Sequence, residues 1–166
     1  GQKNTAVGNL ALYTNATARY NVAVGYEALK VNTIGEQNTA VGYGALKSNT
    51  TGGSNTAIGY EALKQCTISG SNVAVGRRAL LVLTTGLHNT AIGGGVAQNL
   101  TTGKQNVIIG TAAMNSATVG DNCVSIGFWS GINSRGNENT AVGSRALYGG
   151  GDGMNTCIGY NTGNAL

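Results

Sequence analysis

Several features that define common classes of enzyme are missing from this sequence of 166 residues. It has no proline, and only 10 % of its residues are charged and 5 % aromatic. His88 is its single histidine. One histidine makes a Ser-His-Asp triad improbable and cannot by itself form a metal site. The glycine run at 93–95 lacks the Lys and Ser/Thr that follow in a phosphate-binding loop. We therefore expect no catalytic residue, no metal ligand and no cofactor site.

The low charge and its distribution exclude further classes. A chain with so few charged residues is not a disordered polyelectrolyte. Its ten basic residues are scattered, with no run that would follow a nucleic-acid backbone. No stretch of about 18 apolar residues is present. The sequence therefore predicts neither nucleic-acid binding nor insertion into a membrane.

Cysteine is also scarce, with Cys66, Cys123 and Cys157 as its three occurrences. They show no Cys-x-x-Cys spacing, which argues against zinc. Each replaces a small or mid-sized residue of a repeat described below, and Cys123 and Cys157 lie two repeats apart, too far for a disulfide. We expect three buried free thiols that serve as small apolar residues.

What the sequence does contain is one short motif in ten copies. It reads Asn38-Thr39-Ala40-Val41-Gly42 in its clearest form, and its last glycine recurs seven times at intervals of 17 residues and then twice at 16. Self-similarity at a fixed short period indicates a solenoid. The sequence therefore predicts an all-β protein, a parallel β-solenoid of about ten coils. The coils begin at Asn4, Asn21, Asn38, Asn55, Asn72, Asn89, Asn106, Cys123, Asn139 and Asn155.

We number the columns of the repeat from this first residue. Column 1 is Asn in nine coils, column 2 is Thr or Val, column 3 is usually Ala, column 4 is always Val or Ile, and column 5 is always Gly. Columns 2 and 4 are β-branched and share one face of an extended segment. We expect that face to point inward, with column 4 as the core ladder, and columns 1 and 3 to point the other way. The glycine predicts a corner, and the asparagines predict a hydrogen-bonded ladder at another corner.

The next five columns read Tyr26-Glu27-Ala28-Leu29-Lys30 or a relative of it. The apolar column 9 is expected to face the interior. The residue types favour a helical turn, but five residues do not form a stable helix alone. A short second strand and a single 3₁₀ turn are both left open. The alanines of columns 3 and 8 would permit close approach of a neighbouring chain.

With its closing Asn49-Thr50-Thr51-Gly52 turn, the unit resembles the repeats of phage and large-virus tail-fibre proteins. Columns 1 to 5 also resemble the Asn-x-Ala-Ile-Gly core of the head repeats of YadA-type trimeric autotransporter adhesins. The resemblance covers nearly the whole chain. It implies a homotrimer that projects from a virion or cell surface, in the extracellular space, as a rigid spacer or host-attachment module. The chain opens and closes within a coil, which predicts a segment of a longer fibre.

Two alternatives use outward-facing columns. Tyr26, Tyr43 and Tyr60 share a column, and such an aromatic ladder would let the protein bind a host-surface glycan or receptor as an adhesin. An evenly spaced threonine column on a flat solenoid face is the arrangement by which some proteins bind ice. Here that column consists of Thr33, Thr50, Thr67, Thr84, Thr101 and Thr118.

Carboxylates are the one remaining catalytic possibility. Glu27 and Glu61 share a column two coils apart, about 10 Å if coils stack at the strand spacing, near the upper limit for an inverting glycosidase pair. Their neighbours predict an open surface with nothing to raise one pKa. We therefore expect the chain not to be an enzyme.

Overall fold

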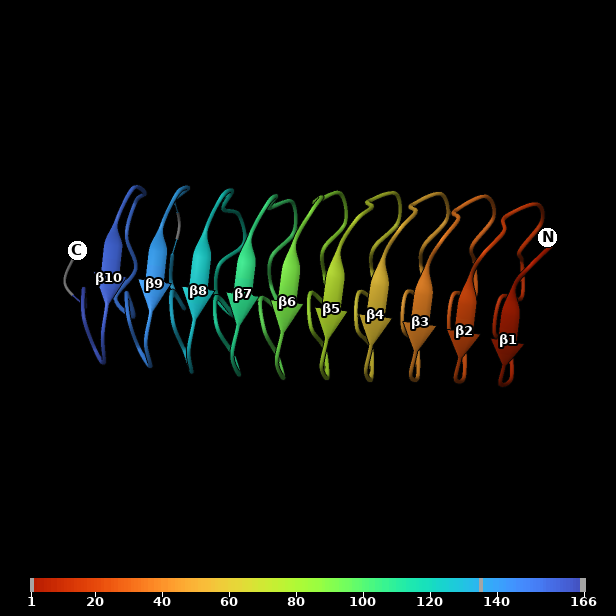
Figure 1. Cartoon of the computed structure of the whole chain (residues 1–166), viewed down its shortest axis with the longest axis horizontal. Helices are drawn as coiled ribbons and strands as arrows, with labels where there is room; N and C mark the ends of the chain where they lie inside the picture. The colour runs from red at the N-terminus through yellow and green to blue at the C-terminus, as the bar shows by residue number, and fades with distance from the viewer. Residues whose placement is uncertain (1, 135, 165–166) are drawn as a thin grey trace.

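A computed structural model describes residues 2–134 and 136–164, and in them the chain forms one parallel β-solenoid. Ten three-residue strands lie side by side in sequence order and point the same way (Figure 1). They occupy columns 2 to 4 of successive coils, as the β-branched residue types predict. The strands are β1 (Thr5–Val7), β2 (Val22–Val24), β3 (Thr39–Val41), β4 (Thr56–Ile58), β5 (Val73–Val75), β6 (Thr90–Ile92), β7 (Val107–Ile109), β8 (Val124–Ile126), β9 (Thr140–Val142) and β10 (Thr156–Ile158).

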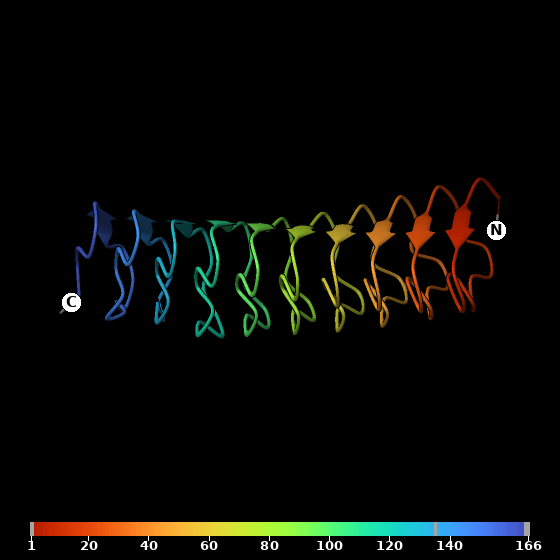
Figure 2. The ribbon, with the colours of Figure 1, turned by 90° about the horizontal axis from the view of Figure 1, so that it is seen from below.

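Each coil has two walls. The strands form one wall, and columns 6 to 10, in which the chain turns back after each strand, form the other (Figure 2). The register between neighbouring strands is one full repeat, so that Ala40 pairs with Ala57 and Val41 with Ile58. No helix occurs among the described residues, and none of them therefore belongs to a helix that could span a membrane.

The face of the sheet that points inward is the opposite of the one expected. Ala40 and Ala57 of column 3 are fully buried, whereas the neighbouring Val41 and Ile58 of column 4 are partly or largely exposed. Column 4 does stack in register along the whole sheet, but on the outside of the molecule. The prediction of an interior Val/Ile ladder is therefore wrong.

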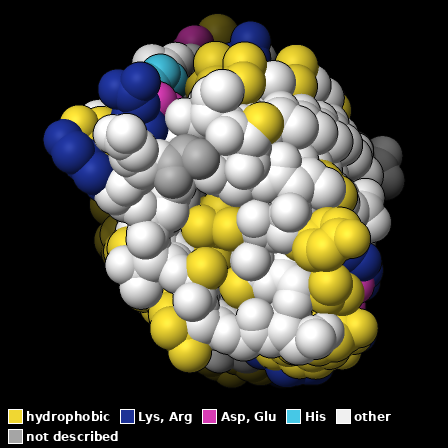
Figure 3. All heavy atoms as spheres, turned by 90° about the vertical axis from the view of Figure 1, so that its right-hand side faces the viewer, with side chains coloured by type: hydrophobic (Ala, Val, Ile, Leu, Met, Phe, Trp, Pro, Cys, Tyr) yellow, Lys and Arg dark blue, Asp and Glu magenta, His cyan; other side chains and the backbone are white. Residues whose placement is uncertain are grey.

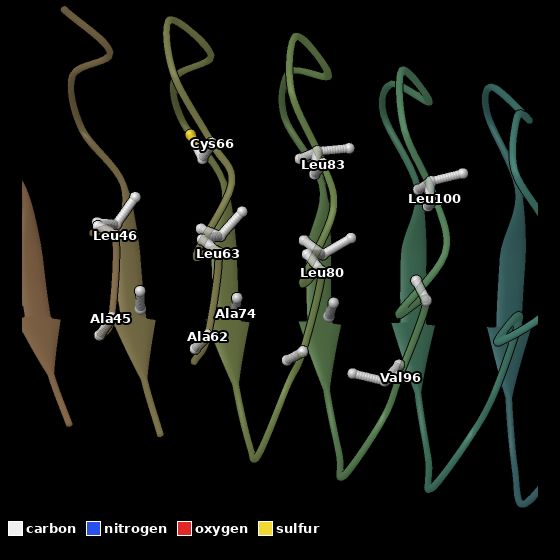
Figure 4. Packing of buried hydrophobic residues seen from close by; sticks show 14 of the residues in the cluster. Ala45, Leu46, Ala62, Leu63, Cys66, Ala74, Leu80, Leu83, Val96 and Leu100 are labelled. Atoms are coloured by element: carbon white, nitrogen blue, oxygen red, sulfur yellow. The ribbon is translucent and has the colours of Figure 1, made fainter. Parts of the chain in front are cut away.

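The size of the interior explains this reversal. Leu46, Leu63 and Leu80 of column 9 form one row of buried side chains on the returning wall, and Ala74 of the sheet lies opposite that wall (Figure 4). The leucines, with the alanines of column 8, fill the narrow space between the walls. Opposite a leucine the sheet supplies a small side chain, because protein interiors pack without room for extra methyl groups. The bulky column 3 residue, Ile108, is also fully buried, but in a coil whose column 9 residue is Met114. The alanines of columns 3 and 8 are consequently core residues and are not available to a neighbouring chain.

Columns 6 to 10 form neither a strand nor a 3₁₀ turn, the two expected possibilities. They form consecutive tight turns, the first closed by a hydrogen bond from the Ala28 amide to the Gly25 carbonyl oxygen. Columns 7 and 9 have positive φ, for example +56° at Glu27 and +49° at Leu29. Two left-handed residues so close together reverse the chain repeatedly, which no regular element does.

The asparagines of column 1 form the predicted ladder, and they do so inside the coil. The side-chain oxygen of Asn38 accepts hydrogen bonds from the backbone and side-chain N–H groups of Asn55. The side-chain amide of Asn55 also donates to the Ser69 carbonyl oxygen. Both asparagines are fully buried, and these bonds satisfy polar groups that would otherwise be costly to bury.

A second asparagine ladder occupies column 12 in the first three coils. Asn32 donates to Asn15, and Asn49 donates to Asn32. From the fourth coil the same column holds Cys66, Leu83 and Leu100, which are fully buried. Column 12 thus changes from polar to apolar between the third and the fifth coil without a change of fold.

Candidate functional site

The outward face of the sheet is the most continuous feature of the surface. It consists of columns 2 and 4, and all twenty of its residues are Thr, Val or Ile. Of the column 4 side chains, Ile58 and Ile92 are each 40 % exposed and Ile109 is 36 % exposed. We call these twenty residues the sheet face. The residues of the sheet face are Thr5, Val7, Val22, Val24, Thr39, Val41, Thr56, Ile58, Val73, Val75, Thr90, Ile92, Val107, Ile109, Val124, Ile126, Thr140, Val142, Thr156 and Ile158.

Sequence reasoning placed this face in the core and so missed it as a surface. The repeat nevertheless contains a pattern that predicts the correct orientation of the strands. Columns 1 and 3 have the same parity along a strand, so a buried asparagine ladder in column 1 requires column 3 to be inward as well. Columns 2 and 4 must then face outward.

The predicted threonine column lies on the turn that closes each coil. The hydroxyl of Thr33 donates to the Thr50 carbonyl oxygen at 2.9 Å, and Thr50 donates to Thr67 in the same way at 3.0 Å. Thr67, Thr84 and Thr101 continue the pattern toward the next coil. The threonines of this column are therefore stacked in register, but their hydroxyl groups donate hydrogen bonds to backbone carbonyl oxygens of the next coil. Ice binding by this column stays a prediction.

The structure brings the three predicted tyrosines together as a stack. The ring centroids of Tyr26 and Tyr43, and of Tyr43 and Tyr60, are 5.2 Å apart, with nearly parallel planes. Beyond Tyr60, the guanidinium of Arg78 lies 5.9 Å from its ring centroid. The rings cover one another's faces and present their edges to solvent. A sugar ring cannot lie flat on Tyr43, so any ligand must approach the edges that carry the hydroxyl groups.

Glu27 and Glu61 are not on an open surface, contrary to expectation. Their side chains are 7 % and 9 % exposed. Glu27 binds Lys30 at 2.5 Å and Lys47 at 2.6 Å, and so bridges two coils. Glu61 binds Lys64 at 2.6 Å and Arg78 at 2.9 Å. Lys30, Lys47 and Lys64, which share column 10, are therefore each paired with a carboxylate.

These ion pairs set the charge states of the two glutamates. The hydrogen bonds from Lys30 and Lys47 hold the pKa of the Glu27 carboxyl below its ordinary value, and outweigh the opposing effect of burial. The hydrogen bond from Lys64, helped by Arg78, lowers the pKa of Glu61 in the same way. A general acid needs a raised pKa, and neither carboxyl has one.

A second aromatic group lies on the same wall in the eighth and ninth coils. The rings of Phe128 and Trp129 stack with centroids 4.7 Å apart, and Tyr148 is tilted against Trp129 at 5.9 Å. The Arg145 guanidinium lies 5.4 Å from the Trp129 centroid and 6.0 Å from that of Tyr148. The sequence analysis gave these aromatic residues no role.

The cysteines are buried free thiols, as predicted. Burial raises the pKa of the Cys66 and Cys123 thiols, which keeps them protonated and unreactive. Among residues 2–134 and 136–164, no three His, Cys, Asp or Glu side chains are close enough together to hold a metal ion.

The chain was compared with known proteins at the level of families, sequences and folds. No protein-family model matches it, and no curated protein and no solved structure is significantly similar to it.

Proposed function

We propose that this chain is a rigid structural segment of a homotrimeric fibre, with the sheet face as the contact between the three chains. The single observation that supports this is the composition of that face: ten strands contribute two ranks of β-branched side chains and no charge. Interface centres are depleted in charged residues, because burying an unpaired charge is costly. The similarity of the repeat to tail-fibre and adhesin repeats favours a location on a virion or cell surface.

The dimensions of the face fit a specific association. Nine strand spacings of about 4.8 Å give a length of about 43 Å, and the two ranks lie about 7 Å apart. With the reach of the side chains, this makes a strip of roughly 400 Å². Strips of that size are among the largest apolar patches on monomeric proteins and commonly mark binding surfaces.

The occupant we propose is a second and a third copy of the same chain, parallel and in register. Identical chains share the same coil spacing, so every coil of one chain meets the equivalent coil of its neighbour. Because the face has two ranks, column 2 can contact one neighbour and column 4 the other. In a closed ring about an axis parallel to the stack, every chain has two neighbours, and both columns of its sheet face are covered. Three chains form the smallest ring in which the two neighbours are different chains.

Sedimentation equilibrium of the chain in dilute buffer tests this proposal. The expected mass is three times the 16.7 kDa of one chain. In the double variant Ile58→Lys/Ile92→Lys, six ammonium groups would enter the interface, and we expect dissociation to monomers with the circular dichroism of the fold retained. A matched control is Ile68→Lys, which changes an isoleucine that is 59 % exposed but lies outside the sheet face.

Two results would count against the proposal. A stable monomer at micromolar concentration would remove the fibre contact altogether. A trimer that persists in the double variant would mean that the chains meet through another surface.

A further inference from the structure

Charge and aromatic residues are concentrated on one wall of the solenoid. The wall opposite the sheet consists of columns 6 to 10, and we call it the turn wall. It carries six of the ten basic residues but only two of the six acidic ones, Glu27 and Glu61, so its formal charge of +4 equals that of the whole chain. It also carries eight of the nine aromatic residues, all except Tyr20. Its basic residues are Lys30, Lys47, Lys64, Arg77, Arg78 and Arg145.

This concentration is a property of the fold and is hidden in the linear sequence. The basic residues are scattered along the chain, but a period of 17 places them in neighbouring coils on one side. The remaining four basic and four acidic residues fall in other columns and cancel. The sheet face, which is uncharged, and the turn wall, which is basic and aromatic, are therefore opposite faces of one flat coil (Figure 2).

We infer that the turn wall binds an acidic polysaccharide that runs along the solenoid axis. The first contact region lies in coils two to five. Glu27 and Glu61 are each shared by two cations, so two of these four positive charges are left uncompensated. Arg77 is exposed and follows Tyr60 in the tyrosine column. Beside these cations, the three stacked tyrosines are 43–45 % exposed.

The chemistry of these groups fits carboxylated or sulfated sugars. Ammonium and guanidinium groups form charge-assisted hydrogen bonds with carboxylate and sulfate oxygens, and phenol hydroxyls both donate to and accept from sugar hydroxyls. A single-stranded nucleic acid is a poorer fit, because its bases need open aromatic faces to stack on. The faces between Tyr26, Tyr43 and Tyr60 are covered by the neighbouring rings.

The second contact region repeats the same combination farther along the wall. There Arg145 lies against Trp129 and Tyr148, and Phe128 is 45 % exposed. Three coil spacings, or about 14 Å, separate Arg77 from Phe128. An extended polymer can reach both regions at once, whereas a monosaccharide cannot, so affinity should increase with chain length.

The inference depends on the proposed function only in requiring that the sheet face, and not the turn wall, lies between the chains. It is tested by binding of the full chain to immobilised polygalacturonate, with neutral dextran and single-stranded DNA as comparison probes. We expect binding to polygalacturonate that weakens with salt, and no binding to dextran. The double variant Arg77→Gln/Arg145→Gln should bind about tenfold more weakly.

The matched control is Arg19→Gln/Lys104→Gln, which removes the same charge from exposed positions off the turn wall and should change the affinity less than about twofold. An equal loss in both double variants would show that only net charge matters and would overturn the inference. So would the absence of polygalacturonate binding, or tighter binding of DNA. The two proposals fail separately, because sedimentation reports the trimer and this assay reports the turn wall.

Discussion

The carbonyl oxygen of Gly59 lies too close to Gly42 for Gly42 to carry a β-carbon. An added Cβ on Gly42 would be 2.5 Å from this oxygen and 2.7 Å from its carbon, and Gly42 has a φ of +132°. The same relationship joins the column 5 glycines of neighbouring coils from Gly8 to Gly143. It explains why no other residue occurs there, since both the conformation and the space exclude a side chain.

The first prediction is that Gly42→Ala destabilises the protein by about 3 kcal/mol or more, through backbone strain and forced separation of two coils. Thermal unfolding followed by circular dichroism measures this as a lowered midpoint. Gly94→Ala is the matched control, because nothing lies within 4 Å of a Cβ at Gly94 and its φ is not in the left-handed region. An unchanged midpoint in Gly42→Ala would contradict the close contact between coils.

The second prediction concerns the buried asparagine ladder. Asn55→Ala removes the acceptor of two hydrogen bonds from Asn72 and the donor to the Ser69 carbonyl oxygen. Each buried polar group left unpaired costs about 1–3 kcal/mol, so we expect a loss of several kcal/mol in the free energy of unfolding. Asn99→Ala serves as the comparison, since Asn99 is exposed and donates one bond, to the Asn115 carbonyl oxygen. Similar losses in the two variants would argue against the ladder.

The third prediction concerns the leucine row. Leu63 is fully buried, and Leu63→Ala should cost about 2–5 kcal/mol by leaving a cavity between the two walls. Ile68→Ala, at a position 59 % exposed, should cost less than about 0.5 kcal/mol. Denaturant unfolding of both variants checks the difference. If the column 4 side chains formed the core instead, Val75→Ala would be the costly change.

The fourth prediction is a dependence of stability on pH. The pKa of Glu61 is lower in the folded protein than its ordinary value of 4.5, so the unfolded chain binds more protons in acid. The stabilisation from the Lys64 and Arg78 pairs is then complete well above pH 4.5 and is lost as the pH falls through the folded-state pKa. The melting midpoint of Glu61→Gln should fall less steeply between pH 5 and 3 than that of the parent. Parallel curves would mean that the ion pairs do not couple to folding.

The fold class could be predicted from the sequence because the period indicates a stack of coils and the β-branched residues of columns 2 and 4 indicate strands. Gly42 and its counterparts mark one corner of every coil, and their regular spacing of 17 and then 16 residues favours a stack of coils. The in-register pairing of the strands follows for the same reason. These features depend on the repeat as a whole and not on any single side chain.

The inside and outside of the coil were assigned wrongly from the same repeat. Val41 and Ala40 are both compatible with a strand, and β-branched residues favour strands on either face. Which of the two is buried depends on what lies across the interior. Where column 9 of the opposite wall is leucine, as at Leu46, the facing strand residue that is buried is the smaller one, alanine. The conformation of columns 6 to 10 could not be predicted either, because Glu27 and Leu29 adopt left-handed φ values that their residue types disfavour.

Because the coils stack in register, the length of the molecule is proportional to the number of coils. Each strand pairs only with the strands before and after it in the sequence. The strand of each coil therefore forms hydrogen bonds only with the strands of its two neighbouring coils. Duplicating residues 38–54 would add one coil and lengthen the molecule by one strand spacing, about 4.8 Å. The contacts between the other coils would stay unchanged. Length could then change by duplication of a short stretch of gene, while the cross-section that any partner meets stays the same.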